Sequence, residues 1–247
     1  MSVKDSRYQD EPMDGVASHR SVTSALLKSI RRFDTCTIAN AIEQFGVRLR
    51  NEGYTREGLQ CVAGDFPQVL GYAATFRVRS SEPSLTGHPY VERTDWWGAI
   101  ERLPAPRIAV IQDLDAGRGF GSCVGEVHAA ILKAFRCEGV ITNGAVRDIP
   151  AIRRMGFPMF ARAIAVSHSY SHLVDFGSPV EIFGLKIQSG NLLYADCHGA
   201  VCIPHEIAAD LPAAAEKIWE HEQRIVDLCQ SPDFSPERLL KVIRRTD

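Results

Sequence analysis

An alternation of glycine-rich turns, helices and strands over residues 119–164 constrains the fold more than any other feature of the chain. It runs as a turn GFGSCVGE, a helix VHAAILKAF, a buried strand GVITNG, a helix PAIRRMG and a strand FPMFARAI. Strands separated by helices of about ten residues favour parallel βαβ units. Ligands of such units bind beyond the carboxyl ends of the strands, so we expect the chemistry in the loops 119–126 and 143–148.

The segments before this region predict short helices and strands. From Ser21 onward, apolar residues at helical spacing predict two helices, the second capped by Asp34 or Thr35 and ending at Gly46. Two strands and a helix between them are expected at residues 70–78, 108–115 and 96–103.

The C-terminal part predicts a small antiparallel sheet followed by helices. Residues 180–204 carry three short strand patterns joined by glycine turns, as in a swivelling or barrel-like small domain. Residues 206–229 form an amphipathic helix pattern, and Ser235 with Pro236 starts a closing helix. The helix pattern carries more apolar residues than one short sheet face needs, which predicts packing against another subunit.

Composition limits the class of protein. At 247 residues, with 45% hydrophobic and 23% charged residues, the chain is globular, and no linker or repeat divides it. We expect a flexible arm at residues 1–20 and one α/β domain over 21–247 with helical flanks. The net charge of -2 gives no electrostatic reason to bind nucleic acid or an anionic membrane. The expected partners are a small molecule and further copies of the chain.

The cysteines and the N-terminus predict the compartment. The seven cysteines are odd in number and include no C-x-x-C pair, which argues against a disulfide framework and a structural zinc site. The first residues lack an apolar signal region, and no later run reaches the roughly 18 apolar residues of a membrane span. We therefore expect a soluble cytoplasmic protein.

Arg147 and Asp148 are the strongest local signal for chemistry. They follow a strand that ends at Thr142 and precede a helix opened by Pro150. A guanidinium in this place can bind a carboxylate with two hydrogen bonds, and the neighbouring carboxylate can hold a divalent cation. The alternative is that Asp148 only caps the helix and that Arg147 is a solvated neighbour.

The turn before the preceding helix is the second signal. Its backbone N–H groups can bind an anion, and Glu126 stands in the first helical turn. Glu126 can equally act as a helix-capping acid, and His128 as a packed helix histidine. Because both loops belong to consecutive βα units, we expect them to open on the same edge of the sheet.

Two further groups favour structural interpretations. Glu220, His221 and Glu222 are typical of a charged, solvated helix face. Cys197 and Cys202 lie five residues apart around a tight turn, which suits packing better than redox chemistry.

The runs GEVHAAILKAFRCEGVITNGAVRDIPAIRRMGFPMFARAI and SGNLLYADCHGAVCIP together resemble the RraA-like family. This family includes the class II 4-hydroxy-4-methyl-2-oxoglutarate/4-carboxy-4-hydroxy-2-oxoadipate aldolases and the regulators of ribonuclease E activity. The resemblance covers roughly residues 25–230 and is densest over 119–204. It implies an α-β-β-α sandwich with a central barrel-like sheet, assembled as homotrimers or homohexamers.

The resemblance also implies roles for particular residues. Asp148 matches the family's aspartate for Mg²⁺ or Mn²⁺, and Arg147 matches the arginine that binds a 2-oxo acid. Glu126 matches an acid that faces substrate and metal waters. A catalytic glutamate that a neighbouring subunit supplies in the family is matched by Glu222, with Glu220 two residues away as the alternative. The turn that faces the substrate comprises Gly125, Glu126, Val127 and His128.

Two motifs depart from the family pattern. The usual P-G-D turn is Ser189-Gly190-Asn191 in this chain, and the usual A-D-x-D-G is Ala195-Asp196-Cys197-His198-Gly199. The resemblance implies a divalent-metal-dependent lyase, an aldolase or a 2-oxo acid decarboxylase, that forms a pyruvate enolate. A non-catalytic regulatory protein, and a hydrolase or hydratase with the same metal site, are the alternatives.

Overall fold

The computed structural model describes residues 22–63, 68–84, 93–117 and 121–244. The predicted arm at residues 1–20 lies outside this part. The helices are α1 (Ser24–Ile30), α2 (Thr35–Glu43), α3 (Arg93–Glu101), α4 (Glu126–Ala134), α5 (Ile149–Met155), a short 3₁₀ turn (His205–Ile207), α6 (Leu211–Gln230) and α7 (Pro236–Arg244).

The main sheet has eight strands in the order β1-β7-β5-β3-β2-β12-β13, with β9 paired to β2 beside this path. These strands are β1 (Gln60–Cys61), β2 (Val69–Arg79), β3 (Arg107–Asp113), β5 (Cys137–Thr142), β7 (Met159–Ala161), β9 (His172–Phe176), β12 (Leu192–Asp196) and β13 (Gly199–Ile203). Strands β2, β3, β5 and β7 are parallel, and the connections between them contain α3, α4 and α5. The predicted βαβ units are therefore confirmed.

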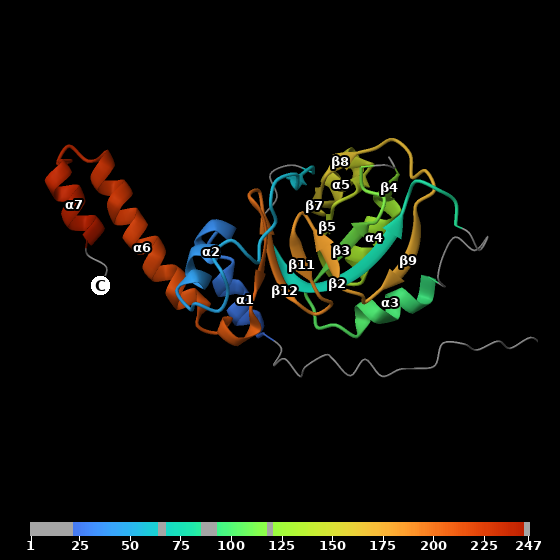
Figure 1. Cartoon of the computed structure of the whole chain (residues 1–247), viewed down its shortest axis with the longest axis horizontal. Helices are drawn as coiled ribbons and strands as arrows, with labels where there is room; N and C mark the ends of the chain where they lie inside the picture. Colours follow the sequence, from blue (N-terminus) through green and yellow to red (C-terminus); the bar gives the residue numbers. More distant parts are fainter. Residues whose placement is uncertain (1–21, 64–67, 85–92, 118–120, 245–247) are drawn as a thin grey trace, which may run out of the picture.

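Two smaller sheets complete the architecture (Figure 1). Strands β4 (Ser122–Val124), β6 (Ala145–Val146) and β8 (Ala163–Ile164) are parallel to one another. Strands β10 (Val180–Ile182) and β11 (Leu185–Ile187) form a separate hairpin. The result is a mixed α/β fold with a nearly closed barrel-like sheet and helices at both termini, as the sequence predicted.

Strand β2 shows why this sheet is buried on both faces. Leu70 and Tyr72 pack with α1, α2 and α6, whereas Phe76 and Val78 on the same face pack with α3 and α4 further along the strand. Val69 and Ala73 point to the other face, where they meet the β10–β11 hairpin. Because residues alternate between faces, an almost continuous apolar run is required along the strand.

The structure corrects three element predictions. The single strand expected over 157–164 divides into β7 and β8, which belong to different sheets. Residues 180–204 hold four strands instead of three. The helix expected from 206 begins at Leu211 instead, since Pro212 lacks an N–H and is tolerated only in a first helical turn.

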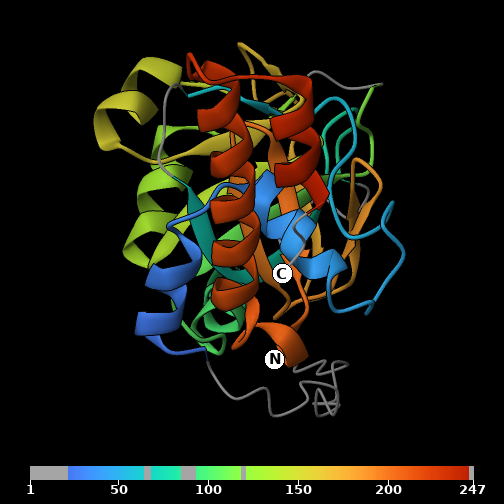
Figure 2. The same cartoon turned by 90° about the vertical axis from the view of Figure 1, so that its left-hand side faces the viewer.

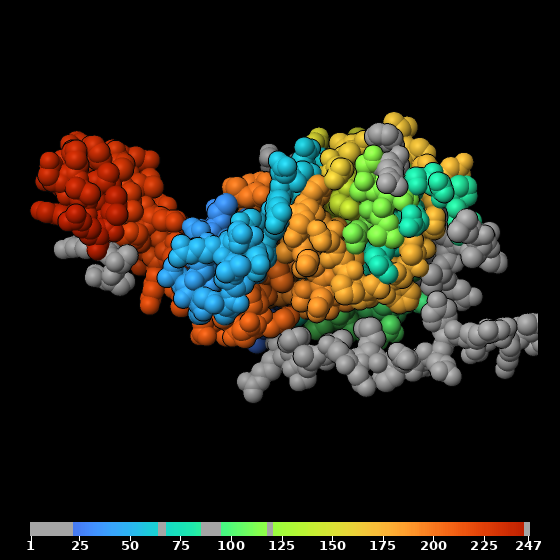
Figure 3. Space-filling view, in the orientation of Figure 1, coloured from blue at the N-terminus to red at the C-terminus, as the bar shows by residue number. Residues whose placement is uncertain are grey.

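The terminal helices α6 and α7 extend away from the barrel (Figures 1 and 3), and Figure 2 shows them side by side in front of it. Helix α6 packs on α2 with its first turns, and its far end carries α7 outward as a projecting lobe. Within the described residues, no helix combines the length and the apolar character that a membrane crossing requires.

Candidate functional site

The two loops predicted to carry chemistry lie side by side. Strands β4 and β6 pair in parallel, and the Arg147 N–H donates to the Val124 carbonyl at 3.0 Å. Gly125 then begins α4, and Asp148 begins α5. The Glu126 N–H donates to Asp148 Oδ2 at 3.0 Å, which joins the starts of the two helices. The expectation that both loops open on one edge is therefore met.

Asp148 adopts an uncommon backbone conformation. Its φ of 60° and ψ of 34° are left-handed, a region that aspartate tolerates better than most residues. Its side chain makes no capping hydrogen bond to α5 and instead accepts from the start of α4. The simple helix-cap interpretation of Asp148 therefore does not describe its side chain.

Gly125 leaves the space that this arrangement needs. A Cβ atom at Gly125 would lie 2.4 Å from Asp148 Oδ2 and 3.0 Å from Arg147 Nε. Arg147 Nε lies 3.5 Å from Asp148 Oδ2, and the two side chains are 35% and 41% exposed. We call the meeting point of Gly125, Glu126, Arg147 and Asp148 the corner. It presents a carboxylate and a guanidinium together, both open to an incoming ligand.

A cavity of about 290 Å³ adjoins this corner. Arg147, His128 and Gly125 form part of its wall. Most of the remaining wall is apolar and comes from β2, β3, α3, α4 and β9, through Phe76, Val78, Ile111, Trp96, Leu132 and Leu173. The cavity therefore offers one guanidinium at its polar end and an apolar body.

Sequence reasoning missed two histidines of this cavity. His168 and His172 lie in its wall, in and just after the connection from β8 to β9. Their Nδ1 atoms are each 2.8 Å from a backbone carbonyl, of Ser169 and Tyr170 respectively. No periodic pattern marks this segment, but two of the eight histidines within five residues was a usable signal.

Cys123 is a cavity residue whose surroundings disfavour the thiolate at neutral pH. Burial raises the pKa of its thiol to about 12, and the charge of Asp113 acts in the same direction. The thiol contacts Thr142 Oγ1 and the Ala145 carbonyl instead. Because the thiolate is the reactive form, covalent chemistry at this cysteine is disfavoured.

Four residues of the predicted site do not line the cavity, and Glu126 and Asp148, at the corner beside it, are two of them. Val127 is 70% exposed and is not part of the cavity wall. Glu222 lies on α6, where its Oε1 accepts from Asn40 of α2 at 3.5 Å, well away from α4 and α5 (Figure 1). Within a single chain, Glu222 does not join Arg147 and Asp148.

The fold and this corner define a class of protein, namely an α/β barrel-like protein with a candidate ligand site at the start of two neighbouring helices. The chain belongs to the RraA-like family, described as aldolase/RraA, whose pattern it matches over residues 35–202. A protein of Halalkalibacterium halodurans, provisionally named a 4-hydroxy-4-methyl-2-oxoglutarate aldolase, is 28% identical over 138 residues, 56% of this chain. The alignments to curated relatives cover 43%, 60% and 14% of those proteins' lengths.

Solved structures share the fold. An uncharacterized protein of Pseudomonas syringae pv. tomato superposes with a TM-score of 0.70 at 20% identity, covering 94% of this chain and 99% of that one. Streptomyces coelicolor RraAS2, described as an unusual member of the RNase ES inhibitor RraA family, gives 0.65 at 21% identity. That match covers 82% of this chain and 97% of RraAS2.

Proposed function

We propose that this chain is a divalent-metal-dependent carbon–carbon lyase that acts on a 2-oxo acid and releases pyruvate. The observation that carries the proposal is the joined corner, where Asp148 accepts from the Glu126 N–H while Arg147 lines the adjoining cavity. The similarity to the provisionally named aldolase supports the same reaction class.

Arg147 is the residue that orients the substrate. A guanidinium binds a carboxylate through two parallel hydrogen bonds, so it fixes both the position and the plane of a 2-oxo acid. The apolar wall beyond it accommodates the carbon skeleton of the substrate and excludes water. Holding the acid in one orientation brings its reacting bond to the carboxylates of the corner.

The residues of this corner fit a hard divalent cation. Asp148 is a partly exposed carboxylate, and Gly125 lacks the Cβ that would fill the space beside it. Mg²⁺ and Mn²⁺ accept sites with one or two carboxylates and several waters, and Asp148 with Glu126 nearby supplies that donor set. When bound, such an ion stabilises negative charge that develops on the 2-oxo oxygen.

The remaining chemistry is proton transfer. Retro-aldol cleavage needs a base for the substrate hydroxyl. Both retro-aldol cleavage and decarboxylation leave an enolate carbon that takes a proton, from the protonated base or from water, before pyruvate is released. Glu126 is exposed at the start of α4, next to the corner, and is the carboxylate that we assign to the hydroxyl proton. Both reactions pass through the pyruvate enolate, and the donors that stabilise it belong to the same corner.

A second candidate is a non-catalytic regulatory protein. The family description itself names both aldolases and RraA, and this chain carries the shared fold. The two candidates differ in one observable. The lyase turns over a 2-oxo acid and needs a divalent cation at Asp148 to do so, whereas a non-catalytic regulatory protein shows no such turnover.

Pyruvate release decides between the candidates. The full chain is assayed with oxaloacetate and with 4-hydroxy-4-methyl-2-oxoglutarate, each with Mg²⁺, with Mn²⁺ and with EDTA. We expect turnover that EDTA abolishes and added metal restores. Absent or metal-independent turnover on all 2-oxo acids would refute the lyase, and a parallel screen for hydrolysis and hydration would then test the remaining use of the site.

A further inference from the structure

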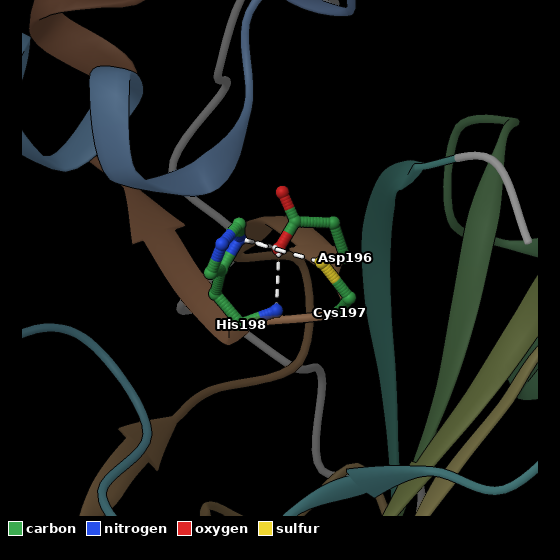
Figure 4. Close-up of side chains that lie close together, drawn as sticks. All are labelled: Asp196, Cys197 and His198. Carbon is green, nitrogen blue, oxygen red and sulfur yellow. Dashed lines mark hydrogen bonds and ion pairs between the residues drawn. The ribbon is translucent and has the colours of Figure 1, made fainter. Parts of the chain in front are cut away.

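The turn between β12 and β13 gathers three metal-binding side chains away from the lyase corner. Asp196 pairs with Gly199 at the end of the two strands, so Cys197 and His198 are the two residues of a tight turn. His198 stands here in place of the second aspartate of the usual A-D-x-D-G. The ligand atoms of Asp196, Cys197 and His198 all lie within 4.8 Å of one another, the only such group among the described residues (Figure 4).

Two of the three ligand-to-ligand distances in this group are close to the edges of a tetrahedral zinc site, and the third is within 4.8 Å. Cys197 Sγ lies 3.6 Å from His198 Nδ1, and His198 Nδ1 lies 3.1 Å from Asp196 Oδ1. Ordinary Zn–S, Zn–N and Zn–O bond lengths in a tetrahedron give an S···N edge of about 3.5 Å and an N···O edge of about 3.4 Å. Small side-chain shifts therefore suffice to place one ion between the three atoms.

Asp196 is fixed in place before any ion binds. It is buried at 6% exposure, and its carboxylate accepts from the Thr35 N–H at 2.8 Å and from the Thr35 hydroxyl at 2.7 Å. It also accepts from the His198 N–H at 2.9 Å. The carboxylate is thus held between the start of α2 and the β12–β13 turn, and a buried negative charge there favours a cation.

A Cys-His-Asp catalytic triad does not fit the same geometry. In a triad the two ring nitrogens of the histidine contact different partners. In this turn, one nitrogen, Nδ1 of His198, faces both the thiol of Cys197 and the carboxylate of Asp196 (Figure 4). Convergence of three ligand types on one point suits an ion and not a proton relay.

The surroundings leave room for an incoming ion. A cavity of about 300 Å³ is lined by His198 together with Cys36, Glu43 and Arg50, which itself pairs with Glu43 at 3.3 Å.

We propose that Asp196, Cys197 and His198 bind one Zn²⁺, with the fourth position directed to the cavity that contains Cys36. Cys197 binds as the thiolate and releases its proton to solvent, and His198 binds through the unprotonated Nδ1. Thiolate and imidazole ligands select zinc over Mg²⁺ and Mn²⁺, so this site and the Asp148 corner take different metals. Bound zinc ties the β12–β13 turn to the start of α2.

Zinc uptake by the full chain tests the proposal. The protein is stripped with EDTA, kept reduced with a phosphine and titrated with Zn²⁺ against a chromophoric chelator. We expect one zinc per chain, bound at least about 100-fold less tightly by Cys197→Ser and by His198→Gln, a loss larger than the 10- to 100-fold typical of outer-shell partners. Co²⁺ in the same site shows a thiolate-to-cobalt absorption band that Cys197→Ser removes.

Two matched variants control for general effects. Cys229→Ser and His221→Gln replace a cysteine and a histidine of α6, outside the cluster, and keep the wild-type zinc affinity. Cys197 and His198 are exposed, and both turn variants retain Asp196, so we expect the variants to fold. Far-ultraviolet circular dichroism verifies this. Wild-type protein that takes up no zinc when reduced, or turn variants that bind it as tightly as the wild type, would overturn the site. Neither result bears on the lyase assay.

Discussion

Arg147 and Asp148 are adjacent in the chain but have different tasks in the proposed reaction. Substitutions at the two positions should therefore respond differently to added metal. We expect Asp148→Asn to abolish pyruvate release at limiting metal and to recover partly as Mg²⁺ or Mn²⁺ is raised. Excess metal does not rescue Arg147→Ala, because the lost two-point contact costs about 2–4 kcal/mol, roughly a 30- to 1000-fold fall in turnover. Arg147→Lys stays poor, since an ammonium cannot reproduce the fork.

Melting temperature measured on the same variants excludes a purely structural role. Arg154→Ala, which removes an exposed cation from α5, is the matched control and keeps the wild-type kinetic constants. If Arg147 and Asp148 only stabilise the start of α5, their variants lose a few degrees of melting temperature and no activity. Unchanged turnover in Asp148→Asn at limiting metal would refute the assignment of Asp148 as the residue that holds the cation.

Gly125 offers a steric test of the same corner. A methyl group at this position would lie 2.4 Å from Asp148 Oδ2, so Gly125→Ala must displace the carboxylate. We expect a loss of metal-dependent turnover of at least about tenfold, in line with the cost of disturbing a metal-supporting group. Gly98→Ala in α3, whose added Cβ meets nothing closer than 3.7 Å, is the control. Equal kinetics in the two variants would show that the corner tolerates the shift.

The residues of this corner show how far the sequence leads. Arg147 and Asp148 could be predicted because a broken strand followed by a proline-opened helix places them at a strand end. The left-handed backbone of Asp148 and its bond to Glu126 could not, because both depend on packing between two βα units. His168 and His172 lie in and just after a connection without helix or strand periodicity. Only their close spacing in the sequence could have indicated that they line the cavity.

At the scale of elements, Asp115 joins the ends of β2 and β3. It accepts from Arg79 at 2.8 Å, from the Ser81 hydroxyl at 2.8 Å and from the Ser80 N–H at 3.1 Å. Burial alone would raise its pKa, but the Ser81, Ser80 and Arg79 interactions outweigh it and lower the pKa below the ordinary value. Asp115 therefore stabilises the fold above the carboxyl's unfolded pKa, and this contribution is lost as pH falls through the folded pKa.

Asp115→Asn should accordingly destabilise the protein most at neutral pH. We expect a loss of about 1–3 kcal/mol at pH 7, because buried donors lose a charged acceptor. The difference from wild type shrinks as the pH falls below about 4, the unfolded carboxyl's pKa, and it is lost at still lower pH, where the native carboxyl is also protonated. Urea unfolding at both pH values measures it, with the exposed Asp95→Asn of α3 as control. A difference that does not change with pH would contradict the charge-based account.

The elements themselves were predictable where one periodicity dominates. Strands β2, β3 and β5 are long apolar runs, and α4 and α5 follow turn signals, so the βαβ core could be predicted. Strand β9 could not, because its residues are only half-buried and pair with β2 at a register shift. The sequence predicts one small sheet over residues 180–204 and does not separate the β10–β11 hairpin from β12 and β13. Glycine turns mark strand ends but not the sheet that each strand joins.

At the scale of the whole molecule, α6 and α7 form a surface that one chain leaves open (Figure 3). Exposed fractions of 41% to 52% on these two helices belong to Trp219, Val226, Leu240 and Ile243. Apolar side chains gathered on two adjacent helices mark an association surface. We propose that it packs on a second copy in a closed homotrimer or a dimer of trimers. Sedimentation at micromolar concentration measures the mass, and Leu240→Glu with Ile243→Glu should reduce it.

Assembly would also explain why Glu222 lies apart from the corner in its own chain. If the α6 of one copy reaches the Arg147–Asp148 corner of the next, Glu222→Gln and Arg147→Ala are each inactive alone. Mixed oligomers of the two variants recover part of the activity, because some of their sites receive both intact residues. The experiment unfolds and refolds the two variants together and follows pyruvate release, with Glu220→Gln as the neighbouring control. A wild-type mass of one chain, or no activity from a mixture that sediments as a mixed oligomer, would remove Glu222 from the site and leave the lyase to Arg147, Asp148 and Glu126.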